Sequence, residues 1–245
     1  MANHQSLGNV ADVSFEYFGN AYSLALTGSS PPIAASQSVC ISYGARSNDQ
    51  WLQYYGFCES DCPHDVYVMP PLREWPLEQM EQAAGRAVAA GRLQALDRAG
   101  LLGFGRGNSS MDRDESGSDA LDENNANTEG GVVVTRTAGL DPAVWQALRA
   151  LFCTEREWSA ASESVGSFAE SSPSSATESA VRVAAACALQ WELDRKATSL
   201  EQDVALQQRL TQSKALDMST AESLALQFRI EKKTLLQETL LELSK

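Results

Sequence analysis

The hydrophobic periodicity of the chain changes near residue 70, and this change limits the possible folds more than any other feature. Before it, short runs rich in β-branched and aromatic residues are separated by turn signals such as Gly19-Asn20. The expected elements are a hairpin of residues 13–18 and 22–27, short strands at 39–43 and 66–69, and one or two helical turns over 48–55. Residues 1–69 therefore predict a β-rich unit.

After Pro70 the apolar residues recur at helical spacing. Pro76 opens a helix that is expected to run past Leu96 and to end at Gly100 and Gly103. Further helix starts are Asp141-Pro142 and the capping boxes Ser175-x-x-Glu178, Thr198-x-x-Glu201 and Ser219-x-x-Glu222. The last two helices hold no strict heptad, which favours an intramolecular bundle over a coiled-coil dimer. The predicted fold class is α+β, with an all-α second domain over residues 70–245.

Two polar segments interrupt the helical region. Residues 105–131 are acidic and rich in Gly, Asn and Ser, so their burial cannot offset the entropy of ordering them, and we expect a disordered insertion. Residues 159–175 are rich in Ser and predict a linker.

The net charge of −13 and the pI near 4.6 argue against nucleic acid as a partner, because phosphate binding needs clustered Lys and Arg. The longest apolar stretches are far shorter than the ~20 residues of a membrane helix, and no membrane span is expected. The first residues lack the basic and apolar regions of a secretory signal.

The cysteines include one local cluster, Cys58-x-x-x-Cys62 with His64 nearby. The five Cys form no Cys-x-x-Cys pair, and the chain has two His, so the usual zinc spacings are absent. Unpaired thiols in a reducing compartment are the preferred interpretation, and no metal is expected.

Four short motifs follow one another in the first unit. They are Asn3-His4, Ile41-Ser-Tyr-Gly44, Arg46-Ser-Asn48 and Tyr55-Gly-Phe57. This order and spacing resemble the end of the SET domain in protein methyltransferases of the Rubisco large-subunit methyltransferase-like class. Within that class, Tyr43–Asn48 and Leu151-Phe-Cys-Thr-Glu155 are most similar to the actin-histidine methyltransferase branch.

The resemblance continues in the helical region. Residues 141–149, 198–203 and 221–236 are similar to the substrate-binding helical domain of the same class. There, a Thr-x-x-Glu-x-Asp element precedes a helix with an Arg-x-x-Glu-Lys type of run, to which Arg229–Lys233 is an approximate match.

The resemblance implies transfer of a methyl group from S-adenosyl-L-methionine to a nitrogen of a protein Lys or His side chain. Tyr43 stands at the position of the catalytic tyrosine, and Arg46 is a candidate for substrate contact. The implied cofactor-binding residues are Met1, Ala2, Asn3, His4, Tyr55, Gly56 and Phe57. The implied partner is a protein substrate, and the expected compartment is the cytoplasm or the plastid, with no signal or transit peptide in this chain.

The chain also departs from the class. It begins two residues before Asn3-His4, so we expect an N-terminally truncated SET domain that lacks the Gly-x-Gly strand turn and the helical insertion of its front half. Ala35-Ser36-Gln37 stands where the class has Gly-Glu-Glu. We expect the chain alone to bind the cofactor weakly. An upstream reading frame that encodes the Gly-x-Gly strand would favour the hypothesis that the complete protein is a methyltransferase. An inactive protein-binding module that retains the helical domain is the alternative, and a purely structural helical partner is the third hypothesis.

Overall fold

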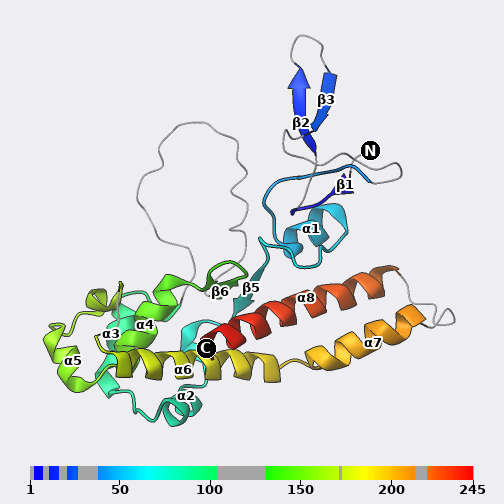
Figure 1. The fold of residues 1–245 in the computed structure, drawn as a ribbon. Helices are drawn as coiled ribbons and strands as arrows, with labels where there is room; N and C mark the ends of the chain where they lie inside the picture. The colour runs from blue at the N-terminus through cyan, green and yellow to red at the C-terminus, as the bar shows by residue number, and fades with distance from the viewer. Residues whose placement is uncertain are drawn as a thin grey trace.

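The computed structural model describes residues 3–7, 11–16, 21–26, 38–103, 131–170, 173–212 and 220–244. It confirms the α+β class, with helices prevailing after residue 70 (Figure 1). Met1, Ala2, the Gly19-Asn20 turn, residues 35–37, the capping residue Ser219 and insertion residues 105–130 lie outside the described residues.

The first unit contains two small strand pairs and one helix. Its elements are β1 (Asn3–His4), β2 (Ala11–Glu16), β3 (Ala21–Leu26), β4 (Cys40–Ile41) and α1 (Asn48–Tyr55). The predicted hairpin is confirmed, since β2 and β3 pair antiparallel with Ala11 opposite Leu26. It projects away from the helices (Figure 1). β1 pairs parallel with β4, which joins the two ends of this unit.

A three-stranded antiparallel sheet connects the first unit to the helices. Its strands are β5 (Val66–Met69), β6 (Val132–Thr135) and β7 (Gly139–Leu140), in that order. The β5 strand matches the expected strand at 66–69, but its partner comes from the region after residue 70. Met69 is also 1% exposed within the main hydrophobic core, so β5 packs with the second region rather than the first.

The helical region contains two short 3-10 helices and seven α-helices among the described residues. They are η1 (Leu72–Glu74), α2 (Leu77–Ala84), α3 (Ala90–Arg98), α4 (Pro142–Phe152), α5 (Glu155–Ala160), η3 (Val165–Phe168), α6 (Ser175–Asp194), α7 (Leu200–Gln212) and α8 (Thr220–Leu243).

The prediction of a single helix from Pro76 past Leu96 is wrong. The structure splits it into α2 and α3 at Gly85, which has φ +64° and accepts the left-handed conformation that ends α2. The apolar spacing continues across this break, which is why periodicity alone merged the two helices.

Two helix caps lie one residue from their predicted positions. Ser174, rather than Ser175, caps α6 by accepting the Thr177 amide. Before α7, Ser199 and Gln202 exchange the two capping hydrogen bonds that were expected of Thr198 and Glu201. The predicted linker at 159–175 contains the end of α5 and the whole of η3, whose Val165 and Phe168 are buried.

The main core lies between the three-stranded sheet and the helices. α6 packs against α2, α4 and α8, while α7 packs against α8 and α8 also contacts β5. In this arrangement the last helices pack against other helices of the same chain, as the sequence favours. Among the described helices, none combines the length and apolarity needed to cross a membrane.

Gly131, at the end of the predicted insertion, is a position where a side chain is excluded. A Cβ there would overlap Val68 Cγ1 and lie 2.8 Å from the Met69 carbonyl oxygen. We expect Gly131→Ala to lower the free energy of unfolding by about 1–3 kcal/mol, because β5 would have to move. Urea unfolding followed by circular dichroism measures this. The control is Gly91→Ala in α3, where the Cβ has open space and no loss is expected; equal effects of the two changes would contradict the prediction.

Candidate functional site

The Tyr55-Gly56-Phe57 motif folds as the end of α1. Gly56 adopts φ +71° and its N–H donates to the Leu52 carbonyl, which closes the helix in a left-handed cap. The chain then reverses, and the Phe57 ring stacks on Trp51 with centroids 5.3 Å apart. The motif thus places two aromatic rings, Tyr55 and Phe57, on either side of a glycine turn.

Pairing of β1 with β4 brings the Asn3-His4 motif beside Tyr43. The Tyr43 backbone N–H donates to His4 Nδ1 at 3.0 Å, and the two ring centroids lie 5.2 Å apart. The His4 ring is also 4.2 Å from Trp51 and 5.9 Å from Phe57. Tyr43 in turn lies 5.6 Å from the Tyr55 ring. We call His4, Tyr43, Trp51, Tyr55 and Phe57 the aromatic cluster.

Tyr55 is the most exposed residue of the aromatic cluster, and Tyr43 and Phe57 are partly exposed. Tyr55 is 48% exposed, and Tyr43 is intermediate. The His4 side chain is 1% exposed, although the residue as a whole is partly exposed, so its backbone reaches solvent and its ring does not. Direct contact of His4 with a ligand is therefore restricted to its backbone.

The remaining predicted site residues lie around this cluster. Asn3 is exposed on β1. The Arg46 guanidinium carbon lies 6.0 Å from the centre of the Tyr55 ring, which places Arg46 at the edge of the aromatic cluster. Among the described residues, Arg46 Nε and Trp51 Nε1 are buried polar atoms without a hydrogen-bond partner.

A partly buried network of polar side chains supports the ring of His4. His4 Nε2 lies 3.0 Å from Ser6 Oγ, and the Ser6 hydroxyl and amide donate to the two Glu59 oxygens at 2.5 and 2.7 Å. Partial burial raises the pKa of Glu59, but the hydrogen bonds from Ser6 outweigh it and leave this pKa below its usual value. Sequence reasoning missed Ser6 and Glu59, because nothing in the local pattern relates two residues that far apart.

A second polar network joins α1 to α8. The Asn48 side chain donates to the Glu59 carbonyl and to Asp65 Oδ2, both at 3.0 Å. Asp65 is fully buried and accepts Lys232 Nζ at 2.7 Å. Lys232 also binds Asp49 and the Val66 carbonyl. The helical region is thus tied to the base of the predicted site through Asp49, Asp65 and Lys232, of which the sequence analysis placed only Lys232 in a motif.

The thiols of Cys58 and Cys62 are both buried. Burial raises the pKa of Cys58 to about 12 and that of Cys62 to about 11, so both thiols stay protonated near neutral pH. Cys62 Sγ donates to the Arg46 carbonyl at 3.3 Å. In the described part of the chain, no group of three His, Cys, Asp or Glu side chains is arranged to hold a metal ion.

The two C-terminal motifs come together as one ionic cluster. Asp203, from the Thr-x-x-Glu-x-Asp element, accepts Lys233 Nζ at 2.6 Å and is also bound by Arg229. Lys233 additionally donates to the Thr198 hydroxyl at 2.8 Å. This cluster fixes α7 against α8. Its side chains satisfy one another, which indicates a structural role.

Asp203 also predicts an acid dependence of stability. Burial raises its pKa, but the hydrogen bonds from Arg229, Lys233 and Thr198 outweigh this and lower the pKa from 3.8 to about 2. Because the folded pKa is the lower one, the stabilisation is complete above about pH 4 and disappears as the pH falls towards 2. It amounts to roughly 2 kcal/mol.

We therefore expect Asp203→Asn to be less stable than the wild type at pH 5, and the difference to shrink by pH 2. Urea titrations at several pH values measure it. Asp194→Asn, an exposed carboxylate at the end of α6, should keep the wild-type pH dependence. Parallel curves for the wild type and Asp203→Asn would refute the expectation.

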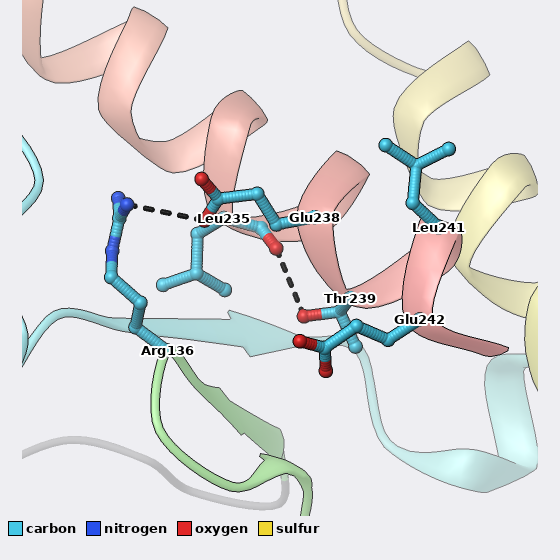
Figure 2. A pocket seen from close by; sticks show the side chains of 6 residues that line it. All are labelled: Arg136, Leu235, Glu238, Thr239, Leu241 and Glu242. Atoms are coloured by element: carbon cyan, nitrogen blue, oxygen red, sulfur yellow. Dashed lines mark hydrogen bonds and ion pairs between the residues drawn. The ribbon is translucent and has the colours of Figure 1, made fainter. Parts of the chain in front are cut away.

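A pocket of about 300 Å³ lies at the C-terminal half of α8 (Figure 2). It is lined by Arg136, Leu235, Glu238, Thr239, Leu241 and Glu242. Arg136 pairs with Glu238 at 3.1 Å across one side of it. None of the predicted site residues lines this pocket, so it is separate from the aromatic cluster.

No protein-family model matches the sequence, and no curated protein matches it. Among solved structures, the chain is similar to Rubisco LSMT bound to sinefungin and monomethyllysine, with 17% identity and a TM-score of 0.49. A structure of Rubisco LSMT bound to AdoMet gives 16% identity and the same TM-score. Each alignment covers 99% of this chain and 48% of the other, so the chain spans about half the length of these proteins. At this level the likeness assigns no family to the chain.

Proposed function

We propose that this chain carries the Tyr43 side of a SET-type active site that transfers methyl groups from S-adenosyl-L-methionine to a protein nitrogen. The proposal rests on one observation: three of the four motifs that resemble the SET core meet in space. Asn3-His4 pairs with the strand before Tyr43, and Tyr55-Gly56-Phe57 turns back onto both. Motifs that matched by chance would have no reason to converge.

The residues present fit the cofactor's reacting end. A sulfonium is a cation, and cations are attracted to the faces of aromatic rings, of which the exposed part of the cluster offers Tyr43 and Tyr55. We propose that Tyr55, Gly56, Phe57 and the backbone of Asn3 and His4 form one wall of the cofactor site; the resemblance also makes Met1 and Ala2 candidates for binding the cofactor. When bound, the cofactor supplies an electrophilic methyl group.

The chain's own contribution is alignment. Methyl transfer is an in-line displacement, so its rate depends on holding the acceptor nitrogen on the axis of the breaking bond. We propose that the Tyr43 hydroxyl orients the neutral acceptor nitrogen, while the backbone bond to His4 keeps Tyr43 in place. Arg46, beside Tyr55, is the proposed contact to the substrate protein.

The substrate is proposed to be a Lys or His side chain of a protein, and the helical region to hold that protein. The motifs Tyr43–Asn48 and Leu151–Glu155 favour the actin-histidine branch. The first motif contributes Tyr43 to the aromatic cluster, whereas Leu151–Cys153 are buried in the helical core. The cytoplasm and the plastid are the proposed compartments.

The test is methyl transfer by the protein encoded by the complete reading frame that contains this chain. It is incubated with methyl-labelled S-adenosyl-L-methionine and an extract from cells that lack it, so that its sites are unmethylated. We expect label in one or a few proteins, recovered after hydrolysis as methyllysine or methylhistidine. A folded protein that transfers no label but captures a partner from the same extract would support the alternative, an inactive binding module.

A further inference from the structure

The hydrogen bonds around His4 have fixed directions. A backbone N–H can only donate, so the bond from Tyr43 requires that His4 Nδ1 carry no proton. The neutral ring must then carry its proton on Nε2 and donate it to Ser6 Oγ. The Ser6 hydroxyl proton consequently points away from the ring, to Glu59 Oε2.

Glu59 is the last residue in this series of hydrogen bonds, and it determines the direction in which each of them donates. As a carboxylate it accepts both the Ser6 hydroxyl and the Ser6 amide and offers no proton in return. Its lowered pKa keeps it in that form at neutral pH. The Asn48 side chain holds the backbone of Glu59 from both sides, donating to its carbonyl at 3.0 Å and accepting its N–H at 2.8 Å.

We propose that Glu59 is a positioning residue of the Tyr43 site. Acting through Ser6, it holds His4 in the tautomer that accepts the Tyr43 N–H and thereby fixes the Tyr43 backbone beside the His4 ring. The effect on methyl transfer rests on the function proposed above, whereas the effect on His4 does not.

The same geometry gives Glu59 a connection to the helical region. Asn48, which clamps Glu59, also binds Asp65, and Asp65 binds Lys232 of α8. An unbroken series of hydrogen bonds therefore runs from α8 to the Tyr43 amide. It supplies a physical route by which the helical region sets the position of Tyr43.

The test reads the tautomer directly in the purified chain. His4 and His64 are the two histidines, so a chain labelled with ¹⁵N-histidine gives two ring systems, and the exposed His64 is an internal reference. We expect wild-type His4 to show an unprotonated Nδ1 and a protonated Nε2. In Glu59→Gln the amide group can donate to Ser6 Oγ, which turns the Ser6 proton towards His4 and favours the opposite tautomer.

The second readout is hydrogen exchange at the Tyr43 amide, which we expect to become about tenfold faster in Glu59→Gln because its acceptor is lost. Ser6→Ala removes the hydroxyl bridge without touching the carboxylate and should mix the two tautomers. It also provides the test if Glu59→Gln does not fold. Glu170→Gln, at an exposed glutamate, is the matched control and should leave His4 and Tyr43 unchanged.

A protonated Nδ1 in the wild type would overturn the proposal. So would a folded Glu59→Gln chain with wild-type His4 signals and wild-type Tyr43 exchange. Neither readout uses the cofactor. A chain that shows the expected His4 signals but belongs to a protein without methyl transfer would therefore count against the proposed function alone.

Discussion

Lys232→Met is expected to lower the free energy of unfolding by about 3–5 kcal/mol, because it leaves the carboxylate of Asp65 buried without its cation. Asp65 is 0% exposed and the Lys232 side chain is 9% exposed. Once Lys232 is replaced, Asp65 retains the donors Asn48 and Val66, which are neutral. A loss of this size is a large fraction of the stability of a typical domain. Urea unfolding at neutral pH, followed by circular dichroism, measures it.

The matched control is Arg182→Met, which removes the same charge and introduces the same residue. Arg182 is 49% exposed and lies 3.9 Å from Glu178, so its pair should contribute less than about 1 kcal/mol. Adding Asp65→Asn to Lys232→Met should recover part of the loss, because it removes the orphaned charge. A cost below about 1 kcal/mol for Lys232→Met would show that the pair does not hold the two regions together.

Tyr43→Phe is expected to lower the rate of methyl transfer at least about 100-fold in the protein of the complete reading frame, because a small misplacement of the acceptor nitrogen costs this much in an aligned reaction. The substitution removes the hydroxyl and keeps the ring, with its contacts to His4 and Tyr55. It also keeps the backbone bond to His4 Nδ1. Stability should therefore change little, and the loss should appear in kcat, measured with labelled cofactor at saturating substrate.

Tyr54→Phe is the control for this experiment. Tyr54 lies on the same helix as Tyr55 and is 50% exposed, so the same chemical change is made close to the site but outside the aromatic cluster. It should leave kcat within about twofold of the wild type, because it removes no group aligned with the transferred methyl. Equal kcat values for wild type and Tyr43→Phe would remove Tyr43 from the proposed catalytic role.

Local signals in the sequence predicted local structure well. Asp141 caps α4 through the Ala143 amide, as the Asp-Pro pair indicates, and Val66–Met69 is a strand. The predicted helix starts were wrong by one residue where two adjacent residues fit the same capping pattern. Ser174 and Ser175 are both residues that favour the N-cap position. The sequence alone does not distinguish which of the two adjacent serines is the N-cap.

Contacts between distant parts of the chain could not be predicted in this way. Val132–Thr135 is a run of β-formers whose pairing with β5 spans the whole acidic insertion. Within the site, the resemblance brought Tyr43 and His4 together, but Ser6 and Glu59 belong to none of its motifs. Their role depends on the direction of individual hydrogen bonds, which composition and spacing do not encode.

Three consecutive charged residues in α8 hold three different parts of the chain. Glu231 accepts the Asp61 amide, Lys232 binds Asp65, and Lys233 binds Asp203. Since a helix advances about 100° per residue, inserting or deleting one residue before Glu231 would turn all three side chains away from their partners together. In a family of related sequences, α8 should therefore change freely in its exposed residues while its length up to this point stays constant.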